Sequence, residues 1–335
     1  MSPTLKVKHA LRDFVPQDAV AFMTKHVAEA AVLHAGCPLD DVAGRAAQMA
    51  RFWAPLLHAL PDLEQRLDIL IGGASAVPPE GSAWLAATGH YAGTFLRPYL
   101  GIPPTGRLAW LRFGAFHRLD AEGRIAETYL LLDLPDLMRQ AGASPLPRPD
   151  AAEFLTPGPA GHDGVVLTAQ DAGETRASYD LVMAMIGGLR RYDRDSLASM
   201  GQHEFWHERM MWYGPGGIGA TRGVDGFQMH YQRHFLHAFP DRKGGDHKAR
   251  LAEGAYVAST GWPSVRATWC GDWLGAVAPQ APIGMRVMDF WRREGARLRE
   301  NWVFIDIPDL HRQIGSPLFA RLVSPGLAGS SAAST

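Results

Sequence analysis

The spacing of hydrophobic residues in the second half of the chain predicts helices first and strands afterwards. Residues 178–199 and 222–238 place apolar side chains at helical intervals. After Pro240, β-rich segments separated by glycine, proline or charged turns follow at 249–261, 263–274, 285–293 and 297–306. A short helix over 307–315 ends the pattern. This order indicates an α+β fold with a curved antiparallel sheet, and it disfavours alternating β-α-β units.

The pattern occurs twice, because the chain contains an internal repeat. Residues 133–142 (DLPDLMRQAG) and 306–315 (DIPDLHRQIG) agree at seven of ten positions. Upstream, LHALPD at 57–62 is answered by LHAFPD at 236–241 in the same order. A whole domain is therefore duplicated, rather than a short repeat unit. The predicted parts are a first domain, a Pro/Gly-rich linker, a second domain and a flexible tail, at 12–144, 145–172, 173–319 and 320–335.

Composition narrows the kind of partner. The chain has 335 residues, a formal net charge of −1 and 47% hydrophobic residues, which excludes a disordered chain and disfavours nucleic acid as a partner. No apolar window is long enough to span a membrane, and the basic N-terminus lacks the apolar core of a secretory signal. Two cysteines, Cys37 and Cys270, are typical of free thiols in a reducing cytoplasm.

Several short motifs are typical of one family. The first copy has GIPPTGR at 101–107, FHR at 116–118 and GRIAE at 123–127, and the second has MDFWRR at 288–293 and ENWVFID at 300–306. Together with the element order, they resemble the SnoaL-like polyketide (ester) cyclase family. The resemblance implies two NTF2-like cones in tandem, each a curved sheet wrapped around helices. It also suggests an intrachain pseudo-dimer, with a homodimer left open.

Carboxylates are the candidate catalytic groups. Asp133 and Asp306 end the last strand of each copy, and strand alternation places Glu300, Trp302 and Asp306 on one face. A carboxylate among aromatic rings loses hydration, so its pKa rises and it becomes a competent general base. The resemblance implies such an Asp, with no metal or organic cofactor, forming an enolate that attacks a carbonyl of the same molecule. The alternative is that each Asp only caps the short helix that follows it.

The resemblance also implies a histidine that assists the base, and His117 matches it in the first copy. The second copy has Trp291 at the corresponding position, which departs from the pattern. The second copy nevertheless carries more ionisable and aromatic residues, so we expect it to be the active half. The predicted substrate-binding residues all lie there: His203, His207, Trp212, Asp289, Trp291, Glu300 and Trp302.

Three further patterns invite other interpretations. His203–His207 fits the H-E-x-x-H zinc signature, but the residues that follow indicate a strand, so no metal is predicted. Residues 214–219 fit G-x-G-x-x-G, yet the dinucleotide reading needs a parallel β-α-β unit, so a loop at the pocket mouth is preferred. His230, His234 and His237 share a helical stripe and are interpreted as packing residues.

The predicted function is therefore general acid–base chemistry on a small, apolar, carbonyl-containing molecule. Aldol-type cyclisation is the family's reaction, and isomerase, dehydratase or hydrolase steps would use the same kind of site. Two alternatives stay open at this point: a protein that binds a small ligand without converting it, and a structural pseudo-dimer.

Overall fold

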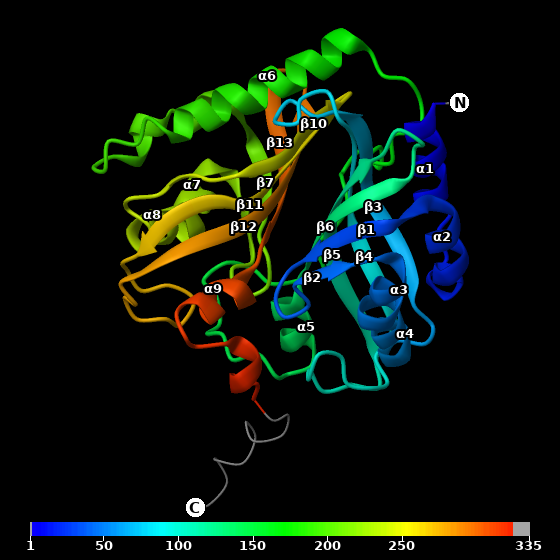
Figure 1. Cartoon of the computed structure of the whole chain (residues 1–335). Helices are drawn as coiled ribbons and strands as arrows, with labels where there is room; N and C mark the ends of the chain where they lie inside the picture. Colours follow the sequence, from blue (N-terminus) through cyan, green and yellow to red (C-terminus); the bar gives the residue numbers. More distant parts are fainter. Residues whose placement is uncertain (1, 324–335) are drawn as a thin grey trace, which may run out of the picture.

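The computed structural model describes residues 2–323, and within them two copies of one α+β unit follow each other (Figure 1). In the first copy the helices are α1 (Pro3–Arg12), α2 (Ala19–His26), α3 (Arg45–Gln48), α4 (Ala54–Ala59) and α5 (Leu134–Gln140). Its strands are β1 (Val27–Ala35), β2 (Asp41–Ala43), β3 (Glu64–Ala74), β4 (Ala83–Thr94), β5 (Leu108–Leu119) and β6 (Ile125–Leu132). Their order in the sheet is β2-β1-β6-β5-β4-β3.

The second copy repeats this arrangement. Its helices are α6 (Ala172–Leu189), α7 (Gly223–Phe227), α8 (Arg233–Ala238) and α9 (Ile307–Gln313). Its strands are β7 (Trp206–Tyr213), β8 (Ala220–Arg222), β9 (Lys243–Gly244), β10 (His247–Glu253), β11 (Tyr256–Trp269), β12 (Ala281–Glu294) and β13 (Arg297–Ile305). The sheet order β10-β11-β12-β13-β7-β8 matches the first sheet, with β9 paired to β11. The α+β expectation and the tandem duplication are confirmed.

Three details differ from the expected pattern. The sheets are mixed, because the first long strand of each copy runs parallel to the last, as β1 does to β6 and β7 to β13. The helix expected over 178–199 spans Ala172–Leu189 instead, and beyond it the Asp193 carboxylate accepts the backbone N–H groups of Asp195 and Ser196 in a turn. The predicted tail begins inside a 3₁₀ turn at Leu318–Arg321, and from residue 324 onward it lies outside the described residues.

The two sheets pack face to face within the chain (Figure 1). One buried cluster joins Trp84, Phe116 and Tyr129 of the first sheet to Phe290 and Phe304 of the second. The rings of Phe116 and Phe290 lie 5.4 Å apart. Each sheet therefore has one face covered by the other copy, while its opposite face curves around its own helices. Among the described residues, no helix combines the length and apolarity that a membrane span requires.

The stretch between α5 and α6 packs along this interface. The Trp302 indole N–H donates to the Pro157 carbonyl at 2.9 Å, and the Ala160 N–H donates to the Glu300 carboxylate. Val165 forms an isolated bridge with Leu70 in the first copy. The predicted linker thus contacts both copies.

Candidate functional site

Each copy encloses a cavity between the inner face of its sheet and its own helices, and the two differ greatly in size. The second copy holds a cavity of about 290 Å³ and the first one of about 60 Å³. Three positions explain the difference. Trp53, Tyr91 and Phe113 fill the first cone, and the equivalent positions of the second are Gln232, Val265 and Val287. The three aromatic residues pack against one another, with Trp53 edge-on to Tyr91 and Tyr91 stacked on Phe113 at 4.4 Å.

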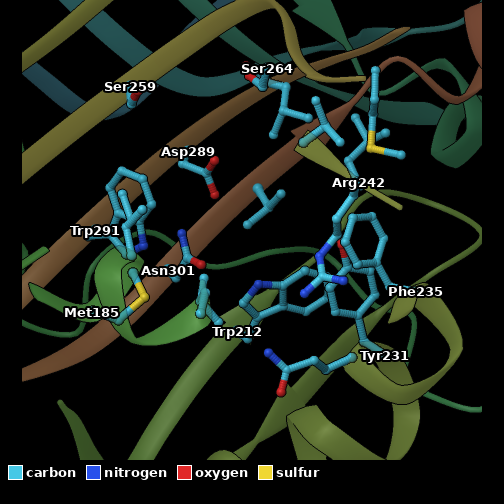
Figure 2. A pocket seen from close by; sticks show the side chains of 18 of the residues that line it. Met185, Trp212, Tyr231, Phe235, Arg242, Ser259, Ser264, Asp289, Trp291 and Asn301 are labelled. Atoms are coloured by element: carbon cyan, nitrogen blue, oxygen red, sulfur yellow. Dashed lines mark hydrogen bonds between the residues drawn. The ribbon is translucent and has the colours of Figure 1, made fainter. Parts of the chain in front are cut away.

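The large cavity has an aromatic floor and a sheet wall (Figure 2). Trp212 of β7 stacks on Tyr231 with ring centroids 4.3 Å apart. Tyr231 belongs to the π-helical turn Gln228–Gln232 between α7 and α8, and the first copy has the same turn at Met49–Trp53. Apolar residues of α6, including Met185, close another side. The cavity is therefore shaped for a small, largely apolar molecule.

A row of polar residues crosses this apolar wall. Ser259, Asp289 and Asn301 come from the adjacent strands β11, β12 and β13, and all three line the cavity. Ser259 is directly opposite Asp289 in the ladder, and Asn301 is opposite Trp291. The equivalent positions in the first copy are Ala87, Ala115 and Thr128. The carboxylate thus exists in only one of the two cavities.

Asp289 has the environment of a general base. Burial raises the pKa of its carboxyl to about 7, against a smaller opposing effect of Asn301 and the Arg250 charge. Asn301 is held in place because its Nδ2 donates to the Phe290 carbonyl at 3.1 Å. A carboxylate with a pKa near neutrality is both available as the anion and strong enough to remove an activated proton.

Two other polar atoms of this cavity lack partners among the described residues. The Gln232 Oε1 and the His247 Nδ1 are buried and accept or donate no hydrogen bond. Buried polar atoms are normally paired, because an unpaired one costs about 1–3 kcal/mol. Both atoms belong to residues that line the cavity, so both are candidates for contacts with a bound molecule.

His117 lines the small cavity of the first copy. Its Nδ1 lies 2.9 Å from the Thr128 hydroxyl, and burial lowers its pKa to about 4. The first copy has no counterpart of the Asp289 carboxylate, because Ala115 occupies the equivalent position. The structure therefore places His117 beside a small apolar space with no carboxylate lining it.

Asp133 and Asp306 lie outside both cavities, at the contact between the copies. Each caps a helix, accepting the backbone N–H of Asp136 or Asp309 at 3.2 Å. Each also accepts a backbone N–H from the other copy: Gly216 donates to Asp133 at 3.0 Å, and Cys37 donates to Asp306 at 3.0 Å. The two carboxylates thus form reciprocal contacts, and neither lines a cavity where a substrate would meet it.

A raised pKa alone does not mark the base in this protein. Burial and the neighbouring Asp136 charge raise the pKa of Asp133, and burial raises the pKa of Asp306 to about 6. Their surroundings differ from that of Asp289, however, because Arg286 lies 3.2 Å from Asp306 and Arg112 lies 3.8 Å from Asp133. Location therefore decides between them: Asp289 lines the cavity of about 290 Å³ in the second cone, whereas Asp133 lines a space of about 20 Å³ at the contact between the copies.

The face of β13 that carries Glu300 and Trp302 is not the face that lines the cavity. Glu300 and Trp302 do share a face, but this face is turned towards the first copy and the linker. The cavity lies on the opposite face, where Asn301, Val303 and Ile305 line it. The expectation that Glu300 and Trp302 bind substrate is corrected accordingly, whereas Trp212, Asp289 and Trp291 do line the cavity.

His203 and His207 lie in a separate hollow, which Glu208 and Asp225 also line. His203 is in a 3₁₀ turn and pairs with Asp225 at 3.2 Å, while His207 in β7 accepts the Arg209 N–H. The H-E-x-x-H motif therefore does not lie on one helix. Within residues 2–323, no group of three or more His, Cys, Asp or Glu side chains is arranged to hold a metal ion.

The glycine-rich motif has a packing explanation. A side chain at Gly216 would place its Cβ 2.3 Å from the Asp136 nitrogen, so only glycine lets this loop reach the first turn of α5. The loop contacts the first copy, and it does not form a nucleotide-binding turn.

In the histidine stripe, His234 and His237 are exposed, so the packing interpretation is wrong for these two residues.

The geometry defines a tandem pair of NTF2-like cones, one filled and one hollow. A model of the SnoaL-like polyketide cyclase family matches the sequence twice, over residues 6–141 and 194–314. These matches cover most of the chain, which therefore belongs to the SnoaL-like polyketide cyclase family. A comparison of the sequence with curated proteins gives no match.

Solved structures resemble one copy at a time. A protein from Jannaschia sp. CCS1, described as a SnoaL-like polyketide cyclase, shares 23% identity over 43% of this chain and 98% of its own, with a TM-score of 0.35. An NTF2-like protein from Burkholderia thailandensis E264 shares 22% identity over 42% and 98%, with a TM-score of 0.32. An NTF2-like protein from Burkholderia xenovorans LB400 shares 14% over 42% and 97%, with a TM-score of 0.34.

Proposed function

We propose that the chain is an enzyme whose second cone performs general acid–base chemistry on a small, largely apolar carbonyl compound of polyketide type. One observation carries the proposal: Asp289, with a pKa raised to about 7, lies on the wall of the cavity of about 290 Å³ inside the second cone, whereas no described carboxylate lines the cavity of the first cone. The first cone supports the fold and the interface.

The proposed step is a proton transfer followed by ring closure. The Asp289 carboxylate removes a proton from a carbon beside a carbonyl group, and the electron pair of the broken C–H bond forms an enolate. The enolate carbon attacks a second carbonyl of the same molecule, which forms a C–C bond and an alkoxide. The alkoxide then takes the proton back from Asp289, so the base is regenerated. This sequence requires a carboxylate alone, so we include no metal or organic cofactor in the proposal.

One side chain of the cavity is suited to the oxygen of the enolate. Tyr231 lines the same space and carries a hydroxyl group, whereas the Asn301 amide already bonds to the Phe290 carbonyl and to the Asp289 carboxylate. Donors of this kind stabilise the charge that develops when a proton leaves. Trp212 and Trp291 provide flat apolar surface on which an aromatic or polyene skeleton would pack.

Exchange of α-protons tests this proposal without knowledge of the natural substrate. In D₂O, the protein is expected to accelerate loss of the C1 protons of 2-tetralone, a small bicyclic ketone, as followed by proton NMR. Because the base must be ionised, kcat/KM should rise about tenfold per pH unit below the Asp289 pKa of about 7 and level off above it. No acceleration, or a rate that falls as the pH rises to 7, would contradict the proposal.

A further inference from the structure

The charged groups of the large cavity are unevenly distributed. Arg190, Arg242, His247 and Arg250 line one part of it, and Asp289 is the sole carboxylate in its lining. The ion pairs among the described residues include none of these three arginines. The cavity therefore holds three guanidinium groups outside any ion pair, and of these Arg250 is the one whose charge acts on Asp289.

Arg242 is the group that points most directly to a ligand. It follows α8 and is half-buried, and Figure 2 shows its side chain running into the cavity towards Tyr231 and Trp212. Its guanidinium lies 5.6 Å from the centre of the Tyr192 ring. Burial lowers its pKa, and the groups that act on its charge are Tyr192, Tyr231 and Arg194, with no carboxylate among them. A guanidinium in such a place is stabilised when an anion binds.

Arg250 extends this cationic side towards the base, and His247 lines the same cavity. The Arg250 Nε donates to the Ser259 hydroxyl at 3.3 Å, and Ser259 is the ladder partner of Asp289. Burial and the charges of Arg250 and Arg190 lower the pKa of His247 to about 4, against a smaller effect of Asp246, which pairs with Lys248. His247 is thus neutral near pH 7, and its buried Nδ1 has no partner.

The first copy shows that the fold does not need these charges. Asp62 and Asp241 make the same pair of hydrogen bonds, to Thr94 and Thr268, so Leu63 is the counterpart of Arg242. The strand registers make Leu67 and Leu70 the counterparts of His247 and Arg250. Three leucines therefore take the place of three cationic or titratable residues in the filled cone, which has no ligand cavity of comparable size.

We propose that the molecule bound in the second cone is an acid: an apolar carbonyl compound whose carboxylate is held by Arg242, with Arg250 and Arg190 adding to the attraction. The inference adds the substrate class to the proposed function. It rests on that function in one respect, because it takes this cavity as the ligand site. The carboxylate end fixes the orientation, and it places the apolar skeleton against Trp212 and Trp291 with the reacting carbon towards Asp289.

Binding of a matched probe pair tests the inference. 2-Naphthoate and 2-naphthamide have the same ring system and differ in charge, and quenching of the tryptophan fluorescence at pH 8 gives both dissociation constants. The full chain is expected to bind the carboxylate at least about tenfold more tightly than the amide, with a preference that shrinks as salt is added. Equal affinities, or no binding of either probe, would overturn the inference.

Substitutions of single arginine residues identify the group that causes the preference for the carboxylate over the amide. Arg242→Gln should remove most of it by weakening the carboxylate alone, and Arg242→Lys should keep part of it. Arg233→Gln makes the same charge change on an exposed residue of α8 outside the cavity, and it should leave both constants unchanged. If Arg242→Gln and Arg233→Gln behave alike, Arg242 is not the carboxylate ligand. If the full chain shows no preference for naphthoate but still exchanges the protons of 2-tetralone in an Asp289-dependent way, this inference is rejected and the proposed function stands.

Discussion

Replacing Asp289 with asparagine is expected to lower the rate of α-proton exchange of 2-tetralone at pH 8 by about 10²–10⁴-fold. A positioned general base contributes a factor of this size, and an amide of the same shape cannot take up the proton. The Asn variant keeps the volume of the wall and the hydrogen bond from Asn301 to Phe290, so the cavity should still bind ligand. The rate constant of exchange, measured by proton NMR on the wild type and the variant, checks this expectation.

Asp225→Asn is the matched control for this experiment. Asp225 is an exposed residue that pairs with His203 outside the cavity, so its replacement should leave the exchange rate unchanged. Binding of 2-naphthamide shows whether the Asp289 variant retains a formed cavity. A variant at 289 that binds the amide normally and exchanges 2-tetralone at the wild-type rate would show that Asp289 is not the base.

Replacing Asp306 or Asp133 with alanine is expected to lower the free energy of unfolding by about 2–5 kcal/mol. Each carboxylate caps a helix, accepts an N–H from the other copy and balances a nearby arginine. Loss of the cap alone costs about 1 kcal/mol, and the buried backbone N–H groups left without an acceptor, together with the lost attraction to the nearby arginine, add the rest. Urea denaturation of each variant measures the change.

Asp171→Ala provides the comparison for these two variants. Asp171 caps α6 through the Glu174 N–H at 2.8 Å, and it is exposed with no contact of this kind to the first copy, so about 1 kcal/mol is expected. The variants at 133 and 306 should keep their exchange activity while they are folded. If Asp306→Ala is no less stable than Asp171→Ala but loses the activity, Asp306 acts in chemistry and the structural interpretation is wrong.

The aspartate that begins the repeated motif lies at the interface in both copies. Asp133 and Asp306 contact the opposite copy, and Arg139 and Arg312 in the same motif bond to the carboxylates of Asp136 and Asp309. Both copies must make these contacts for the two halves to fit each other. The large cavity occurs in only one copy, so its lining residues need not be identical in both copies. Identical positions in the two copies therefore mark the shared scaffold.

Sequence patterns predicted the elements well and the site only in part. Helical and strand periods gave the order of elements, and alternation correctly separated Trp302 from Asn301. Alternation cannot say which face of a strand is hollow, because both faces are buried here, one by the other copy and one by the helices. For this reason the sequence pattern places Glu300 and Trp302 in the site and does not indicate Ser259 or Gln232.

A different reading of the sequence would have found the missing residues. Positions where one copy is apolar and the other polar include Ala115 and Asp289, Ala87 and Ser259, and Leu63 and Arg242, and in each pair the polar member lines the large cavity. Leu63 and Arg242 directly follow the aligned motifs LHALPD and LHAFPD, whereas the pairing of Ala87 with Ser259 depends on strand registers and becomes visible only in the structure.

A crystal structure of the chain with bound 2-tetralone tests the central claim, that one cone of the two is the site and Asp289 its reactive group. We expect the ketone in the second cone, packed on Trp212, with its C1 carbon against the Asp289 carboxylate and the first cone filled by its own side chains. A ketone bound in the first cone, or one in the second cone with its carbonyl and C1 directed away from Asp289, would contradict it.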